Sequence, residues 1–176
     1  QFGGLVNFIT KPPKLNKKLE IISRNTTGSF GLYTNFTSLS GTNKKLSYYG
    51  YINYKKGNGF RPNSDFDSNN ALIHLGYQLN KNNKISLEFT YLDYLAQQAG
   101  GLSDNMFNNN PLQSNRSRNW FKVDWLLYNF KWAHKFSDRS NLTFNFFGLN
   151  ASRKTIGYRI RRVDLPDPGG ARELLI

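Results

Sequence analysis

Six side chains that can hold an anion gather around a long polar stretch at residues 100–120. They are Gln97, Gln98, Arg116, Arg118, Asn119 and Trp120. Guanidinium forks and amide groups donate several hydrogen bonds at once to an oxygen-rich anion. We therefore take these residues as candidate ligands of an anion. The alternative is the ordinary polarity of a solvated loop and of a wet strand end.

A second group of arginines lies near the end of the chain. It consists of Arg153, Arg159, Arg161 and Arg162. This group is a second candidate for holding an anion, and contact with anionic lipid sugars explains it equally well.

The remaining polar residues assemble no catalytic or metal site. His74 and His134 stand alone, without a second ligand at short spacing. Asp65 and Asp67 alternate as at the start of a calcium loop, but the mid-loop glycine and closing glutamate are missing. The chain has no cysteine, and no nucleophile elbow, phosphate loop or catalytic carboxylate pair occurs. We expect a protein that is not an enzyme and holds no metal or other cofactor.

Alternation of apolar and polar residues predicts the elements that position these side chains. Successive side chains of a strand point to opposite faces, so a period of two indicates a strand with one apolar and one wet face. The pattern predicts strands over residues 19–28, 31–40, 46–56, 70–80, 85–97, 121–136 and 141–158. The expected fold class is all-β, an antiparallel up-and-down meander without helices longer than two turns.

The predicted connectors alternate between short and long. "GTNKK", "KNNK" and "SDRSN" are tight polar turns, whereas residues 57–68 and 100–120 are long. Short and long connectors therefore fall on opposite ends of the meander, as in an outer-membrane barrel. The connector near residues 28–30 is an exception, since it is short on the long side.

The apolar faces have the height of a membrane band. Four to five alternate apolar positions at ~3.3 Å per residue span roughly the 25 Å lipid band of a transmembrane barrel. We predict lipid contact for Ile73, Leu75, Ile85, Leu87, Phe89, Leu126, Tyr128, Phe130 and Trp132. A soluble sandwich or barrel whose apolar faces meet inside is the alternative, although the predicted strands exceed the usual five or six residues.

Composition is compatible with this interpretation. No stretch approaches the ~20 apolar residues of a membrane-spanning helix, while a barrel strand needs only roughly 9 to 11 alternating residues. The net charge is +13, which suits nucleic acid, an anionic lipid surface or an anionic solute. Gln1 and Ile176 both look like cut ends, so we expect an internal fragment of a longer protein.

Four segments resemble TonB-dependent outer-membrane receptors. "GGLVNFITK" (3–11) resembles the closing strand of the plug domain in that family. Residues 49–68, 94–107 and 117–125 ("YGYINYKKGNGFRPNSDFDS", "YLAQQAGGLSDNMF" and "SRNWFKVDW") are similar to the first third of the barrel in the ferric dicitrate receptor branch, in versions from Bacteroidetes-like bacteria.

The resemblance implies a 22-stranded transmembrane barrel filled by a plug, located in the bacterial outer membrane. Residues 1–13 would be the end of the plug, 14–18 a linker, and 19–176 about the first seven barrel strands. The implied function is active uptake of a ferric chelate, ferric dicitrate or a siderophore. The implied partners are that chelate, outer-membrane lipid and lipopolysaccharide, and a TonB-type energy-coupling protein that acts through a missing N-terminal part. Nucleic acid is not an expected partner.

Two other functions remain open on the sequence. A passive porin-like barrel would share the strands, but the plug-like "GGLVNFITK" argues against it. A secreted basic β-protein that binds polyanions would share the charge and the aromatic content, and it would purify without detergent.

Overall fold

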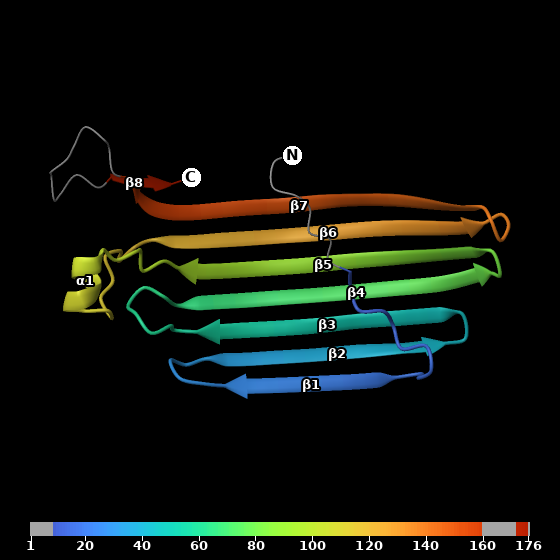
Figure 1. Cartoon of the computed structure of the whole chain (residues 1–176), viewed down its shortest axis with the longest axis horizontal. Coiled ribbons are helices and arrows are strands. Elements are labelled where there is room, and N and C mark those ends of the chain that lie inside the picture. The colour runs from blue at the N-terminus through green and yellow to red at the C-terminus, as the bar shows by residue number, and fades with distance from the viewer. Residues whose placement is uncertain (1–8, 160–171, 176) are drawn as a thin grey trace.

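The computed structural model describes residues 9–159 and 172–175, and these form one antiparallel sheet (Figure 1). The strands are β1 Glu20–Thr27, β2 Tyr33–Asn43, β3 Leu46–Gly57, β4 Phe66–Asn80, β5 Asn83–Gln97, β6 Trp120–Lys135, β7 Asn141–Arg159 and β8 Arg172–Leu175. Every strand pairs with its neighbour in sequence, in the order β1 to β8. The predicted all-β, up-and-down meander is therefore confirmed.

Several details differ from the sequence prediction. β4 begins at Phe66 rather than at residue 70, because residues 66–69 continue the pairing with β3 and β5. The short strand β8 pairs with the end of β7 and was not predicted. Residues 9–11, expected to end a plug strand, have no regular structure, and residues 1–8 of that expectation lie outside the described residues.

The connectors divide the sheet into two unlike ends. Tight turns join β2 to β3, β4 to β5 and β6 to β7 at one end, which we call the short-turn end (Figure 1). At the other end, the long-connector end, residues 58–65 and 98–119 form the longer links. The link between β1 and β2 is short on this side, as the sequence suggested, and is closed by a hydrogen bond from Gly28 N to Leu32 O of 2.9 Å.

The only helix among the described residues is α1, Asp104–Asn109, within the second long connector. The Ser103 side chain caps it by accepting a hydrogen bond from Met106 N at 3.3 Å. No helix in the described part of the chain is both long and apolar enough to span a membrane.

Strand register sorts the side chains into two faces. Residues paired across a ladder lie on the same face, so Ile73 shares a face with Phe89, Phe89 with Tyr128, and Leu87 with Phe130. We call this the apolar face; from β1 to β7 it also carries Ile21, Leu39, Ile52, Leu75, Tyr77, Ile85, Tyr91, Leu126, Trp132, Phe144 and Phe146. The opposite side, the polar face, carries residues such as His74, Glu88, Asn129 and Lys131.

A single sheet leaves almost no buried core. Among the described residues, the buried hydrophobic side chains are Tyr49, Leu72 and Ala99. Tyr49 and Leu72 lie on the polar face, where residues 9–18 also run. The apolar face has no cover from the described chain, so its large side chains remain exposed.

Residues 9–18 are fixed to the polar face by hydrogen bonds near the end of β2. Lys14 N donates to Ser40 Oγ at 2.8 Å, and Thr42 Oγ1 donates back to Lys14 O at 2.9 Å. Thr42 N also donates to Lys17 O at 2.8 Å. The Ser40 side chain is buried beneath this contact, with 4% of its surface exposed.

Replacing Ser40 by alanine removes the acceptor for Lys14 N and leaves that amide partly buried without a partner. We expect the free energy of unfolding to fall by about 1 kcal/mol. Hydrogen exchange at residues 14–18 should accelerate, while exchange within β4 to β6 should not change. Ser29→Ala, an exposed hydroxyl in the β1–β2 link, is the control. Equal exchange in both variants would show that this contact does not hold the segment.

Candidate functional site

The apolar face brings all nine residues with predicted lipid contact onto one surface. Pairing of β4 with β5 and of β5 with β6 aligns Ile73 with Phe89 and Tyr128, and Leu75 with Leu87 and Phe130. The exposed fraction is 47% for Ile73, 42% for Phe89 and 37% for Trp132. Such a contiguous apolar surface is unusual on a soluble protein. Their common placement is an observation, whereas contact with lipid stays a prediction.

An open hollow lies on the apolar face where Gly50 has no side chain. It has a volume of about 590 Å³ and is lined mainly by apolar groups of β2 to β5, among them Leu39, Ile52 and Ile73. Gly50 pairs with both Leu39 and Ile73, so the missing side chain opens the space between two apolar residues. The accessible surface of this hollow is almost entirely apolar, and no charged side chain lines it.

Polar side chains form the border of the apolar face at the long-connector end. Lys122 Nζ lies 3.0 Å from Asp93 Oδ2, and Tyr54 OH donates to Asp67 Oδ2 at 2.8 Å. Asn69 Nδ2 donates to the other oxygen of Asp67 at 3.1 Å. We call Tyr54, Asp67, Asn69, Asp93 and Lys122 the polar collar. At the polar collar, charged and polar side chains enter the apolar face, although the exposed Leu95 lies beyond Asp93.

A polar group links residues 9–18 to the centre of the polar face. Glu88 Oε2 accepts a hydrogen bond from Thr10 Oγ1 at 3.0 Å and lies 3.2 Å from His74 Nδ1. His74 and Glu88 are paired on β4 and β5, so the sheet register places them together. In the part of the chain that the structure describes, no three potential metal-binding side chains come together.

Two buried polar atoms on the polar face have no hydrogen-bond partner in the described structure. They are Trp125 Nε1 and Asn129 Oδ1, both on β6. Buried polar groups are normally paired with protein or with water. The polar face therefore holds one buried donor and one buried acceptor that the described residues leave unpaired.

The two long connectors are held to each other by Arg61 and Asn63. The Arg61 guanidinium donates to Gln113 O at 2.9 Å, to Gly100 O at 2.8 Å and to Ala99 O at 3.3 Å. Asn63 Nδ2 donates to Gln98 O and Asn119 O at 2.9 and 3.1 Å. Both side chains thus come from residues 58–65 and bind the backbone of residues 98–119.

The predicted anion ligands are brought together only in part. Gln97 pairs with Trp120 where β5 ends and β6 begins, and Gln98 N donates to Asn119 O at 2.9 Å. By register, however, Gln97 and Trp120 share the face of Tyr91 and Leu126, which is the apolar face beyond its collar. The sequence had placed Gln97 at a strand end and Trp120 in the long loop.

Arg116 and Arg118 lie in the connector just before β6. Arg116 is half-buried, and its Nη1 donates to Asn115 O at 3.1 Å. Arg118 is exposed and stands one residue from Asn119, whose Oδ1 is buried without a partner in the described structure. Their role as anion ligands stays a prediction.

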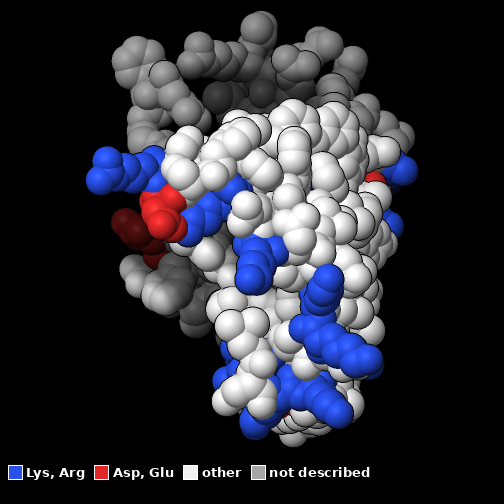
Figure 2. All heavy atoms as spheres, turned by 90° about the vertical axis from the view of Figure 1, so that its right-hand side faces the viewer, with Lys and Arg blue, Asp and Glu red and all other residues white. Residues whose placement is uncertain are grey.

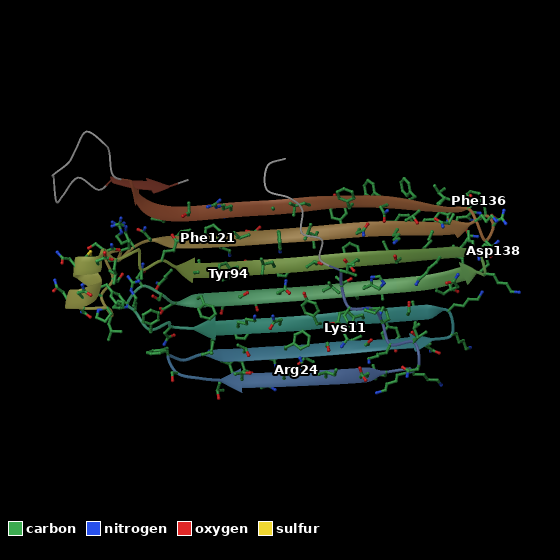
Figure 3. The ribbon with its side chains drawn as sticks, viewed as in Figure 1. Lys11, Arg24, Tyr94, Phe121, Phe136 and Asp138 are labelled. Carbon is green, nitrogen blue, oxygen red and sulfur yellow. The ribbon has the colours of Figure 1, made fainter. Side chains whose placement is uncertain are left out.

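The second arginine group is described in part. Arg153 lies on β7 with its guanidinium carbon 4.9 Å from the centre of the Phe121 ring, and Phe121 also contacts Tyr94 at 6.3 Å between rings (Figure 3). This cation–π contact occupies one face of Arg153. Arg159 ends β7, paired with Arg172, and Arg161 and Arg162 lie outside the described residues.

Sequence reasoning missed the residues that organise the long connectors. Arg61 was seen only within "GNGFRP", and its carbonyl partners are 38 to 52 residues away in the chain. No local pattern announces such contacts. The bond from Thr10 to Glu88, separated by 78 residues, was missed for the same reason.

No protein-family model matches this chain, and no curated protein matches it. The resemblance to TonB-dependent receptors therefore stays a prediction, and the function is argued from the fold and the site.

Replacing Arg61 by alanine should loosen the long connectors without unfolding the sheet. Three hydrogen bonds from one charged group to carbonyls are lost, with a cost of about 1.5–3 kcal/mol. We expect faster hydrogen exchange at residues 98–119 and unchanged exchange in β2 to β4. Arg61→Lys is the matched variant, because it keeps the charge but cannot reach three carbonyls with one planar fork. If the lysine variant protects the connector as well as arginine does, charge rather than geometry holds it.

Proposed function

We propose that this chain forms part of a transmembrane β-barrel in the bacterial outer membrane, of the TonB-dependent receptor type, that takes up a ferric chelate such as ferric dicitrate or a siderophore. The observation that carries the proposal is the apolar face, which is continuous from β3 to β6 and reaches β1, β2 and β7 at Ile21, Leu39 and Phe146, with a mainly polar face behind it. A barrel wall in lipid requires this arrangement, with apolar residues outside and polar residues towards a wet interior.

The open edges of the sheet agree with a larger barrel. β1 and β8 each have a partner on one side only among the described strands. Backbone groups at an open edge cannot remain unpaired in lipid, so a spanning sheet must close through further strands. In the proposed receptor, this segment would supply roughly the first third of a 22-stranded wall, as the family resemblance suggests.

The contacts of residues 9–18 support a plug at the polar face. These residues run across the face that would line the barrel interior, and they bind Glu88, Ser40 and Thr42. Trp125 Nε1 and Asn129 Oδ1 are further groups on that face that a plug segment or water could pair. The proposed plug would then be pulled by a TonB-type protein outside this segment.

The long-connector end would face the cell exterior and receive the chelate. Arg116 and Arg118 lie there, on a connector that Arg61 and Asn63 hold in place. A ferric chelate with citrate is anionic and rich in oxygen, so guanidinium groups can bind it through the carboxylates without touching iron. The same loops could instead contact lipopolysaccharide, which the binding test below separates.

A secreted protein that binds polyanions is the less favoured alternative. It would need cover for the exposed apolar face, and the described residues supply none. A soluble protein with this surface would aggregate or require a partner.

An arginine on the apolar face should destabilise the protein in a bilayer. Phe146 pairs with Phe130 within the apolar face and is 58% exposed. We expect Phe146→Arg to reduce the free energy of folding into lipid bilayers by ~2–4 kcal/mol. The measurement is reversible folding of the full chain, within its complete barrel, into neutral vesicles.

Asn145→Arg is the matched control for this test. Asn145 is the preceding residue of β7, exposed on the polar face opposite Lys131. Repulsion between like charges paired across strands costs only roughly 0.2–1 kcal/mol. If Asn145→Arg proved the more damaging variant, the facing of the strands would be inverted and the proposed barrel would be wrong.

Removing an arginine at the long-connector end should weaken chelate binding. Losing a charge-assisted hydrogen bond costs ~1.5–3 kcal/mol, which is roughly a ten- to hundredfold loss of affinity. We expect this loss for Arg116→Ala, Arg118→Ala or both, measured as ferric-citrate binding to the complete receptor at low and high salt. Arg139→Ala, at the short-turn end, is the control and should bind normally. Unchanged affinity in both loop variants would remove this pair from the site.

A further inference from the structure

Lysine and arginine side chains crowd the short-turn end of the sheet. Figure 2 views this end directly, and most of the charged groups that it shows are basic. The turns contribute Lys44, Lys45, Lys81 and Arg139, and the adjoining strand ends contribute Lys84 and Lys135. All six are exposed, and we call them the basic rim. Lys17 and Lys18, just before β1, extend the same charge.

The nearby acidic groups neutralise little of this charge. Glu20 lies 2.7 Å from Lys17, and Asp138 lies 2.6 Å from Lys135. Within the described turns and the start of β1, Glu20 and Asp138 are the only acidic residues. Lys44, Lys81 and Arg139 form no ion pair among the described residues, so their charge is available to an external anion.

The apolar face meets the basic rim directly. Trp132 lies on β6 at this border, and its indole N–H donates to Asn83 Oδ1 at 3.2 Å. Tryptophan with a polar handle is typical of the boundary between lipid tails and headgroups. Phe136, 63% exposed, stands in the β6–β7 turn beside Asp138 (Figure 3). Exposed apolar side chains and basic side chains therefore lie next to each other at the short-turn end.

The opposite end of the apolar face is different in kind. In the polar collar, Lys122 is paired with Asp93, and Asp67 is bonded by Tyr54. Five acidic residues lie at or near the long connectors, namely Asp65, Asp67, Asp93, Asp104 and Asp124, against Glu20 and Asp138 at the short-turn end. Basic charge is therefore compensated less at the short-turn end.

From this juxtaposition we propose that the basic rim binds anionic phospholipids of the leaflet at the short-turn end, with their phosphates at the rim and their acyl chains on the apolar face. The proposal rests on the proposed barrel function, because only an inserted sheet presents the rim at headgroup level. A dissolved polyanion would satisfy the charge but would leave the adjoining apolar face bare. A phospholipid satisfies both surfaces with one molecule.

The positive charge of the basic rim is complementary to an anionic phospholipid headgroup. Each lysine or arginine near an anionic membrane surface increases binding by about fivefold. Such contacts weaken when salt shortens the screening length from ~10 Å at 0.1 M to ~3 Å at 1 M. Binding should therefore favour anionic over zwitterionic lipid and should depend strongly on salt.

The experiment compares two labelled lipids around the inserted protein. The full chain within its complete barrel is reconstituted in phosphatidylcholine with traces of dansyl-labelled phosphatidylglycerol or dansyl-labelled phosphatidylcholine. Energy transfer from the tryptophans reports local enrichment. In the native chain we expect phosphatidylglycerol to be enriched by about fivefold or more at low salt. The enrichment should fall towards one at 1 M salt.

Two variants with equal loss of charge separate the rim from net charge. One carries Lys44→Gln, Lys45→Gln, Lys81→Gln and Arg139→Gln. The control carries Arg24→Gln, Lys55→Gln, Lys56→Gln and Lys154→Gln, which are exposed residues in the half of the sheet nearer the long connectors. Enrichment lost in the rim variant and kept in the control supports the proposal. Equal enrichment in both variants overturns it.

Failure of this proposal can be told from failure of the barrel. Insertion into neutral bilayers is judged by quenching of tryptophan fluorescence with brominated lipid. If the chain inserts but transfers energy equally to both labels, the proposed barrel stands and the proposed lipid site is wrong. If the chain does not insert, both the proposed barrel and the proposed lipid site are wrong. A heparin fragment tests for a general polyanion site. If it binds the rim in detergent and also displaces phosphatidylglycerol from the inserted protein, the phospholipid assignment is wrong.

Discussion

Cross-strand register is the constraint on which the whole structure depends. Because side chains alternate along each strand, a slip of one residue in any ladder would move an entire apolar set to the other face. The ladders from β1 to β7 avoid this, so that Ile21, Leu39, Gly50, Ile73 and Phe89 fall in one row across five strands. The short turns hold the register, since a tight link leaves no slack between paired strands. The irregularity between Gln78 and Asn80 is confined to the turn end of β4 and leaves the apolar row intact.

The polar face obeys a second constraint, which is the pairing of buried polar groups. Ser38, Ser40 and Ser47 are buried there, although serine is usually exposed. Ser40 accepts from Lys14 N, and Ser47 donates to Gly76 O at 3.2 Å, so their burial is compensated. Small hydroxyl side chains allow the backbone of residues 9–18 to approach the sheet closely. An apolar side chain at Ser40 would fill space but would leave Lys14 N unpaired.

Local patterns in the sequence were enough to predict the strands, their antiparallel order and the residues of each face. Alternation in segments such as 71–79 is a local signal, and the register follows from turns of a few residues. The connectors were predictable in length but not in structure. Arg61 and Asn63 donate to backbone carbonyls, and Thr10 donates to the Glu88 carboxylate. All these partners lie far away in the chain, so no local pattern of residue types indicates them. For the same reason, the sequence could nominate Gln97 and Trp120 as ligands but could not predict that they would pair across β5 and β6.

The dimensions of the apolar face favour a membrane over a soluble core. From Ala71 to Leu79 the face extends over eight residue steps of β4, which is about 26 Å along the strand at ~3.3 Å per step. A tilt of roughly 40° in a barrel reduces this height to about 20 Å, close to the ~25 Å apolar band of such proteins. A soluble sheet would need no such limit, because its apolar rows can run to the ends of the strands. Here the rows stop on one side at the ion pair of Lys122 and Asp93 and on the other at Trp132 and Asn83. Between these borders, the apolar face of β4 and β5 carries no charged residue, since positions 71, 73, 75, 77, 79, 85, 87, 89 and 91 are all apolar or tyrosine. A band of fixed height with polar limits on both sides is what a bilayer imposes on a strand.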